Sequence, residues 1–141
     1  MEKHLHALRR AGHKLTPQRR AVLAALQASP AFPAALDIFR RVRASLPDIS
    51  LDTVYRTLAL LVEMGLVNQI NLPGHGGNVF ELVGDSHHHH HLICLKCGRA
   101  ECLDYCPVKS HEFAAAQKRG FTVVSHSLEF YGYCRDCRAA N

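Results

Sequence analysis

Apolar residues recur every three or four positions through the first part of the chain, a spacing typical of helices with one buried face. The expected helices cover residues 3–11, 17–28, 35–46 and 51–64. Thr16 before Pro17 is a common helix start, because the threonine oxygen accepts a hydrogen bond from a free amide of the first turn. Ser50 has the same role for the last of these helices, and Gly65 is expected to end it.

Two short β-strands are expected after these helices, over residues 66–71 and 78–83, and a glycine-rich turn joins them. Three helices closed by such a hairpin form a winged helix, a helix-turn-helix variant whose last helix enters the major groove of DNA. We therefore predict a winged-helix DNA-binding domain over residues 1–83.

The rest of the chain, residues 84–141, has the pattern of a second domain, with a hinge expected at Gly84 and Asp85. Strands are expected over 87–94, 98–103 and 121–131, with a helix over 107–119. A helix that covers an antiparallel sheet leaves an open edge at which two chains can pair. The predicted fold class is therefore α+β, with an N-terminal winged-helix domain and a C-terminal α/β dimerisation domain.

Positive charge is concentrated in the front part of the chain. Through Leu72 there are ten Lys and Arg against five Asp and Glu, whereas from Pro73 onward there are seven of each. All six cysteines and eight of the eleven histidines lie in the second part. The basic first part indicates contact with a polyanion, and the second part, rich in His and Cys, indicates metal binding.

The sequence pattern also bears on the compartment. No apolar run has membrane-spanning length, and residues 1–11 lack the apolar stretch of a secretory signal. We therefore expect a cytoplasmic protein with no membrane partner, in which cysteines stay reduced and available to metal.

Two Cys-x-x-Cys pairs provide the strongest chemical signal. Two residues between cysteines let both thiolates turn toward one ion, and two pairs supply the four ligands of a closed tetrahedral Zn²⁺ site. Two disulfides or a dithiol redox centre are the alternatives, disfavoured because no secretory segment accompanies the cysteines and no βαβ pattern surrounds a pair. The predicted structural zinc ligands are Cys94, Cys97, Cys134 and Cys137.

An unbroken run of histidines leads into the first cysteine pair. Side chains of a strand alternate between its two faces. One face would carry His89 and His91, and the other His88 and His90. Two imidazoles at i and i+2 can bind one ion, so the run can serve two metal sites. A purification tag is the alternative, disfavoured because tags sit at chain ends and this run continues directly into a predicted strand.

Four segments closely resemble the ferric uptake regulator (Fur) family. They are LTPQRR at 15–20, DTVYRTL at 52–58, the histidine run with its cysteine pair, and HSLEFYGYC at 126–134. The match covers nearly the whole chain. The resemblance implies a cytosolic homodimeric repressor that binds a palindromic operator in double-stranded DNA and controls metal homeostasis genes. Members of the family respond to iron, zinc, manganese, nickel or peroxide.

The resemblance makes the last helix of the front domain the recognition helix, with Tyr55 and Arg56 at base edges and Thr53 beside them. An arginine can hold guanine in a bidentate pair, and a tyrosine ring can pack on a thymine methyl. Lys14 and Arg19, near the start of an earlier helix, are the expected additional DNA contacts. Two alternatives to DNA contact stay open. Lys14 and Arg19 could be ordinary solvated basic side chains, and Tyr55 could be a half-buried aromatic of the helix.

The family's regulatory metal site lies between the two domains, and the resemblance implies Glu81, His89 and His91 as ligands here. Two departures change the expected metal. Phe32 stands where the iron and peroxide sensors have a histidine, and Cys102 stands where they have a carboxylate. An added thiolate favours Zn²⁺ over Fe²⁺. Regulatory Zn²⁺ is therefore expected, with Fe²⁺ or Mn²⁺ as alternatives.

Many members of the family have a further metal site. By resemblance it would take His88, His90 and His126, together with one residue of the helix in the second domain. Glu112 is the expected helix ligand, and His111 is the alternative in nearly the same register.

These features predict a metal-dependent DNA-binding transcriptional repressor that responds to zinc or iron. The alternative within the family is a peroxide-sensing repressor that uses bound Fe²⁺. An enzyme is not expected, because a nucleobase deaminase requires a His-x-Glu motif and the sequence has none. Cys102 and Cys106 stay open as ligands, core sulfurs or a redox pair, and His75 stays open as a substitute ligand.

Overall fold

The computed structural model describes residues 1–74, 77–84 and 90–139. It divides the chain into two compact units, Met1–Gly84 and Asp85–Asn141. Three candidate ligands lie outside the described ranges: His75, His88 and His89. Within the described ranges, no helix is long and apolar enough to cross a membrane.

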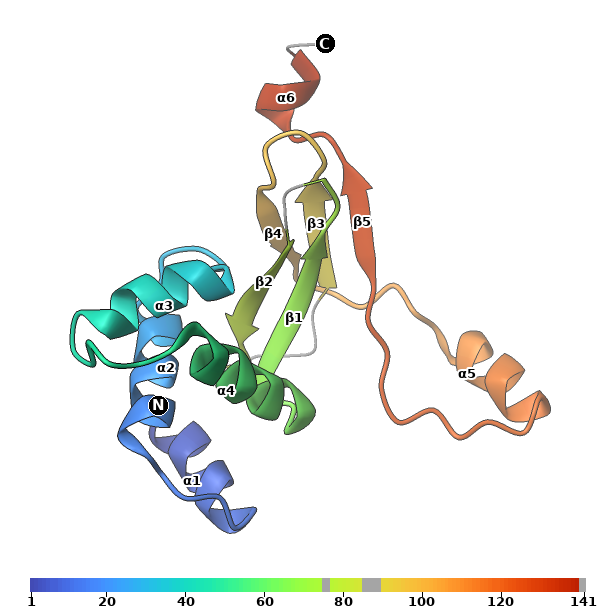
Figure 1. Ribbon diagram of the computed structural model, residues 1–141. Helices are drawn as coiled ribbons and strands as arrows, with labels where there is room; N and C mark the ends of the chain where they lie inside the picture. Colours follow the sequence, from blue (N-terminus) through green and yellow to red (C-terminus); the bar gives the residue numbers. More distant parts are fainter. Residues whose placement is uncertain (75–76, 85–89, 140–141) are drawn as a thin grey trace. The chain divides into compact units, whose positions relative to one another are not determined.

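The first unit consists of helices followed by a β-hairpin (Figure 1). Its elements are α1 (Glu2–Arg10), α2 (Pro17–Gln27), α3 (Ala35–Arg43), α4 (Leu51–Glu63), β1 (Val67–Leu72) and β2 (Gly77–Leu82). Thr16 Oγ1 accepts the backbone N–H of Arg19 at 3.3 Å, as expected for the start of α2. Ser50 Oγ accepts the backbone N–H of Thr53 at 3.1 Å at the start of α4. Gly65 follows α4 with φ of 69°, so both predicted caps and the predicted end are confirmed.

One apolar core joins the helices of the first unit to its hairpin. Fully buried side chains from each helix and from β1 form its centre: Leu8, Leu23, Ile38, Leu58, Leu61 and Val67. The hairpin is antiparallel, with Val67 opposite Leu82. The backbone N–H of Phe80 donates to the carbonyl of Pro33 at 2.9 Å, which fixes the hairpin beside the start of α3. The predicted winged helix is confirmed.

The third helix is shorter than predicted, because α3 ends at Arg43 rather than at residue 46. Ser45 Oγ donates to the carbonyl of Val42 at 3.2 Å, and such local bonds compete with the next helical turn. Pro47 also disfavours helical geometry at the residue before it.

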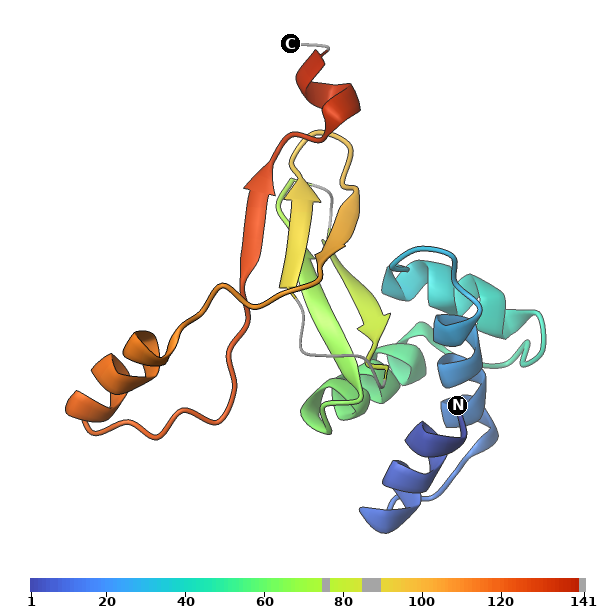
Figure 2. The ribbon, with the colours of Figure 1, turned by 180° about the vertical axis from the view of Figure 1, so that it is seen from behind.

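The second unit is built on a sheet with strand order β4-β3-β5 (Figure 2). Its elements are β3 (His90–Cys94), β4 (Ala100–Leu103), α5 (Ser110–Lys118), β5 (Glu129–Gly132) and α6 (Arg135–Ala139). β3 pairs with β4 in the antiparallel sense, but with β5 in parallel. The expectation of an antiparallel sheet is therefore wrong for one of these pairs. The long connection through α5 makes the parallel return possible.

Two predicted elements of the second unit differ from the structure. α5 begins at Ser110 rather than at 107, and none of its residues is buried, so it does not cover the sheet within this single chain. The strand predicted over 121–131 becomes regular only at Glu129. Upstream of it, Phe121 is 69% exposed and Val124 is 94% exposed. Apolar side chains favour a strand when it gives them a surface to pack on, and the described part of the chain provides no such surface for Phe121 and Val124.

Candidate metal centres and nucleic-acid interface

The four cysteines of the two Cys-x-x-Cys pairs converge in the second unit. The sulfur atoms of Cys94, Cys97, Cys134 and Cys137 all lie within 4.8 Å of one another. Cys97 Sγ and Cys134 Sγ are 3.9 Å apart. Thiolates at about 2.3 Å from a tetrahedral Zn²⁺ are about 3.8 Å apart, so the cluster fits a structural zinc ion as predicted.

The pairing of β3 with β5 explains this convergence. Cys94 is the last residue of β3 and lies beside Gly132 of the parallel strand β5. The next backbone N–H, that of Leu95, donates to the carbonyl of Gly132 at 2.8 Å. Cys97 follows in a tight turn, and Cys134 and Cys137 sit at the start of α6. The metal would therefore join the exits of two strands that are distant in sequence.

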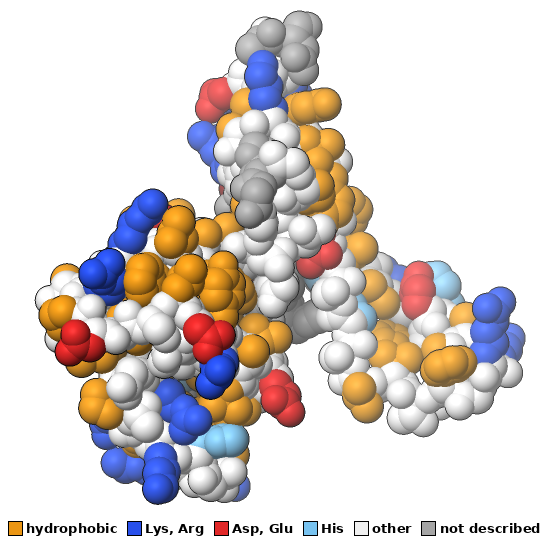
Figure 3. Space-filling view, in the orientation of Figure 1, with side chains coloured by type: hydrophobic (Ala, Val, Ile, Leu, Met, Phe, Trp, Pro, Cys, Tyr) orange, Lys and Arg blue, Asp and Glu red, His pale blue; other side chains and the backbone are white. Residues whose placement is uncertain are grey.

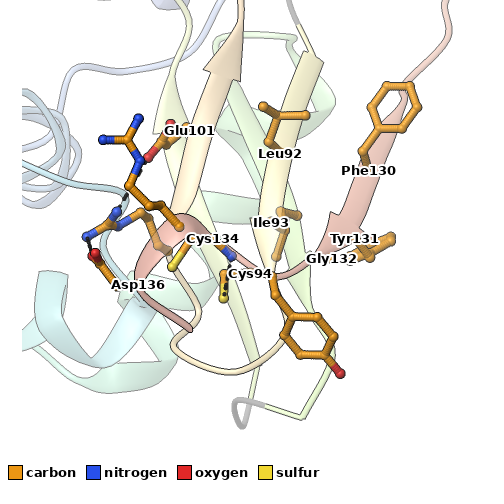
Figure 4. A pocket seen from close by; sticks show the side chains of 12 residues that line it. Leu92, Ile93, Cys94, Glu101, Phe130, Tyr131, Gly132, Cys134 and Asp136 are labelled. Carbon is orange, nitrogen blue, oxygen red and sulfur yellow. Dashed lines mark hydrogen bonds and ion pairs between the residues drawn. The ribbon is translucent and has the colours of Figure 1, made fainter. Parts of the chain in front are cut away.

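Backbone amides prepare one of these sulfurs for metal. N–H groups of Cys97 and Cys134 point at Cys94 and lower the pKa of its thiol from 9.0 to about 6, against the opposing effect of burial. The Cys134 N–H lies 3.4 Å from Cys94 Sγ, and Figure 4 shows the two cysteines facing each other. Cys137 behaves oppositely, because its thiol donates to Cys134 and the pKa rises to about 12. These opposite shifts favour the thiolate form at Cys94 and the thiol form at Cys137.

A cationic side chain lies next to the cluster. Arg99 Nη2 contacts Asp136 Oδ2 at 3.3 Å, and Arg99 Nη1 lies 3.8 Å from Glu101 Oε1. Negative charge at Cys134 and Asp136 raises the pKa of this arginine further above its ordinary value. These residues border a cleft of about 560 Å³ on the sheet (Figure 4). Arg99 thus compensates part of the charge that four thiolates bring to the site.

A second cluster of metal-ligating side chains lies in the same unit. Cys106 Sγ is 3.2 Å from His90 Nε2 and 3.3 Å from His126 Nε2. His90 is only 1% exposed, and its ring centroid is 5.1 Å from that of His126. The structure therefore brings together two residues predicted for the further metal site and adds a thiol that the sequence reasoning left open.

Glu112, the ligand that the sequence predicted from the helix α5, has other partners. Glu112 Oε2 accepts the backbone N–H of Lys109 at 2.8 Å, and Glu112 Oε1 lies 2.7 Å from His111 Nε2. The carboxylate thus stabilises the start of α5, where unpaired amides favour negative charge. The structure does not bring Glu112 to His90 and His126, and the remaining residue of that prediction, His88, lies outside the described residues.

The residues predicted for the regulatory site are divided between the units. Glu81 lies on β2 in the first unit, is 9% exposed, and accepts the amide of Asn68 at 3.1 Å. In the second unit, His91 and Cys102 are directly opposite on the antiparallel strands β3 and β4. His91 is 4% exposed, whereas Cys102 is exposed. As a complete ligand set the site stays a prediction, and His89 lies outside the described residues.

The helix predicted to read DNA presents polar groups on its open face. Tyr55 on α4 is 52% exposed, so about half of its surface is open to a partner, and the alternative of a half-buried helix aromatic stays open. Arg56 Nε pairs with Asp52 Oδ2 at 2.8 Å, and the two side chains are 82% and 67% exposed. Thr53 Oγ1 is 2.8 Å from the capping oxygen of Ser50, which places it at the start of the helix.

Basic side chains lie over the helices of the first unit (Figure 3). Arg19 Nη1 donates to the carbonyl of Lys14 at 2.6 Å, while the backbone N–H of Arg19 completes the cap of α2. Lys14 is exposed and Arg19 is partly exposed. The bond holds the Arg19 guanidinium beside the backbone of Lys14.

Sequence reasoning missed three partners at these sites. The ion pair of Asp52 with Arg56 has the i, i+4 spacing that pairs side chains on a helix, so the sequence did contain a signal for it. The contact of Arg99 with Asp136 joins distant segments and had no local signal. Cys106 was singled out, but its place between two imidazoles depends on long-range folding.

Comparison with known proteins identifies relatives over nearly the full length. The model of the ferric uptake regulator family matches residues 10–131. The peroxide-responsive repressor PerR of Staphylococcus epidermidis is 32% identical over 138 residues, covering 98% of this chain and 90% of that protein. The solved ferric uptake regulator of Vibrio cholerae is 32% identical, with a TM-score of 0.66, and the match covers 92% of this chain and 98% of that one. The ferric uptake regulator of Pseudomonas aeruginosa, solved with manganese, is 29% identical with a TM-score of 0.70, covering 91% and 95%.

The family match extends across both units, because it begins in α1 and ends in β5. The matched residues include most of the winged helix and the first cysteine pair, Cys94 and Cys97. On this evidence the chain belongs to the ferric uptake regulator family, and it is a metal-dependent, DNA-binding transcriptional repressor.

Proposed function

We propose that this repressor responds to zinc and that it binds a palindromic operator as a cytoplasmic homodimer. In this proposal residues 1–83 bind DNA, and residues 84–141 form the dimer and hold the metals. The regulatory metal would be held by Glu81, His89, His91 and Cys102. Zinc when bound supplies a crosslink among these side chains, and Zn²⁺ accepts nitrogen, oxygen and sulfur ligands together.

The observation that carries the preference for zinc is the placement of Cys102 opposite His91. Directly opposite residues of an antiparallel pair project from the same face with Cβ atoms about 5 Å apart. An imidazole and a thiol at that separation can ligate one ion. A thiolate favours Zn²⁺ over Fe²⁺ and Mn²⁺, which prefer oxygen and nitrogen ligands.

The proposed response is a shift between two populations of the dimer. The repressor binds its operator when both recognition helices are held at the spacing of two half-sites. Full switching from 1:99 to 99:1 requires about 5.5 kcal/mol of differential binding between the two states. The basic first unit supplies the salt-dependent attraction to phosphates, while Tyr55 and Arg56 supply discrimination among bases.

DNA binding at buffered free metal concentrations tests the proposal. A DNA target would be selected from a random pool with the zinc-loaded protein and then titrated with Zn²⁺, Fe²⁺ or Mn²⁺. We expect tight binding to require Zn²⁺ at the lowest free concentration of the three. A Cys102→Ser variant should lose this preference and respond to Fe²⁺ or Mn²⁺ at least as well. Equal metal preference in both proteins would contradict the proposed role of the thiol.

A peroxide response is the second candidate, because the staphylococcal relatives at 32% identity are peroxide-responsive repressors. In that case bound Fe²⁺ would promote oxidation of a ligand histidine, His89 or His91. Mass spectrometry after peroxide treatment distinguishes the two proposals. The mass of one added oxygen atom on either histidine, seen only in the iron-loaded protein, would favour the peroxide sensor over the zinc sensor.

A further inference from the structure

Three side chains from separate parts of the second unit meet at one buried point. His90 comes from the central strand β3, Cys106 from the connection before α5, and His126 from the connection after α5. Their ligand atoms all lie within 4.8 Å of one another. The thiol lies between the imidazoles, 3.2 Å from one ring nitrogen and 3.3 Å from the other.

These separations agree with binding to a single ion. A sulfur at about 2.3 Å and a nitrogen at about 2.05 Å from a tetrahedral Zn²⁺ lie about 3.5 Å apart. The observed distances are within about 0.3 Å of that value, so small rotations of the side chains would suffice. His90 is 1% exposed, which gives the site a fixed ligand on the most central strand of the sheet.

We propose that Cys106 supplies a thiolate ligand to the further metal site expected at His90 and His126, and that this chain's version of the site therefore takes Zn²⁺ or a similarly thiophilic ion. The thiol occupies the ligand position that the sequence had suggested for Glu112, whose carboxylate instead stabilises the start of α5. This changes the chemistry of the site. A sulfur ligand favours Zn²⁺ over Mn²⁺ and Fe²⁺, whereas a carboxylate suits the harder ions.

The placement of the ligands gives this site a structural consequence. Cys106 and His126 flank α5 in the chain, and His90 belongs to the sheet. None of the residues of α5 is buried, so packing contributes little to its position. A bound ion would therefore fasten both connections of α5 to β3. Phe113 of α5 contacts the His126 ring at 5.8 Å between centroids, so an ordered His126 also orders this part of the helix.

Cobalt substitution tests the sulfur ligand directly. Full-length protein that retains zinc in the four-cysteine cluster is titrated with Co²⁺. Thiolate ligation of Co²⁺ produces a sulfur-to-cobalt charge-transfer absorption in the near ultraviolet. We expect Cys106→Ser to abolish the part of this absorption that arises from the first equivalent of Co²⁺, and His126→Ala to weaken Co²⁺ binding at least tenfold.

Matched variants separate this site from its neighbours. His111→Ala and Glu112→Gln change the adjacent histidine and carboxylate, and both should leave the Co²⁺ spectrum unchanged. Cys102→Ser tests the thiol of the proposed regulatory set. If the absorption survives in Cys106→Ser but disappears in Cys102→Ser, the proposal is wrong and the sulfur belongs to the regulatory set. Loss of the Co²⁺ absorption in Glu112→Gln would also overturn the proposal, because the site would then use the carboxylate.

A second readout follows the position of α5. Hydrogen exchange of residues 104–128 should slow when Zn²⁺ is added to wild-type protein, and it should not change in Cys106→Ser. Equal protection by Zn²⁺ in both proteins would show that the ion does not fasten these segments. Neither measurement uses DNA. If the proposed zinc response fails, the Co²⁺ and hydrogen-exchange results still stand, and if those results fail, the zinc response can still be correct.

Discussion

At the scale of single residues, the ion pair of Arg56 bears on its proposed role as a base reader. Its pair with Asp52 holds the guanidinium along α4, but both side chains are largely exposed. Exposed ion pairs contribute about 0–1 kcal/mol. Arg56 can therefore exchange its carboxylate partner for a base edge at small cost, and Asp52 keeps the side chain in a limited range of positions until it does.

Replacement of Arg56 by Ala should reduce operator discrimination by about 1–3 kcal/mol, because a bidentate contact to guanine is lost while the fold is unchanged. Competition among single-base variants of the selected DNA target measures this. Arg40→Ala is the matched control, since Arg40 is also exposed and also pairs with an aspartate on its own helix, Asp37 at 3.8 Å. Undiminished discrimination in Arg56→Ala would exclude this residue as a base reader.

Cys97 is predicted to be indispensable for the second unit. In a small unit with little apolar burial, zinc affinity contributes directly to the free energy of folding. Cys97→Ser should therefore lose about one zinc per chain and the cooperative melting of this unit. Cys102→Ser, which removes a thiol outside the four-cysteine cluster, should retain both. Metal content and circular dichroism measure the difference, and an unchanged melting curve for Cys97→Ser would refute the structural role.

The opposite pKa shifts in the cysteine cluster predict a pH dependence of zinc binding. At pH 7 Cys94, with a pKa of about 6, is already a thiolate, whereas Cys137, with a pKa of about 12, still carries its proton. Zinc must displace that proton, so affinity should increase about tenfold per pH unit for each proton released. Competition with a chelator between pH 6 and 9 tests this. If the zinc affinity does not change between pH 6 and 9, the thiols are already deprotonated before zinc binds.

At the scale of elements, local signals predicted what local interactions determine. The starts of α2 and α4 were predicted from Thr16 and Ser50, because a cap involves residues only three positions apart. The parallel pairing of β3 with β5 and the meeting of His90 with Cys106 join distant segments, and no periodicity contains that information. The strand predicted over 121–131 had the right composition, but composition alone does not supply a surface to pack on.

The cap of α4 provides a test of how far the recognition helix depends on one side chain. Ser50→Ala removes the acceptor for the Thr53 amide and should destabilise the first unit by about 1 kcal/mol. Urea unfolding measures the change. Ser45→Ala is a suitable comparison, because its hydroxyl bonds to the carbonyl of Val42 after the end of α3 and caps no amide. If Ser50→Ala loses no more stability than Ser45→Ala, the cap contributes nothing measurable to the free energy of unfolding.

At the scale of the whole molecule, the proposal gives DNA binding to the first unit and most of the metal ligands to the second, so regulation requires that the two be coupled. Coupling between two sites is a difference in binding free energy, commonly 1–3 kcal/mol, and it is reciprocal. Operator DNA should therefore raise the affinity of the regulatory site for zinc by the same factor that zinc raises the affinity for DNA.

His91 is the described residue at which this coupling is best tested. It is 4% exposed on β3, opposite Cys102, and it is not part of the four-cysteine cluster. His91→Ala should retain structural zinc but lose the roughly 5–150-fold effect of added Zn²⁺ on DNA affinity. His13→Ala, a partly exposed histidine in the first unit, serves as the control and should respond as wild type does. If the DNA affinity of His91→Ala still increases when Zn²⁺ is added, the regulatory ion is held by other residues.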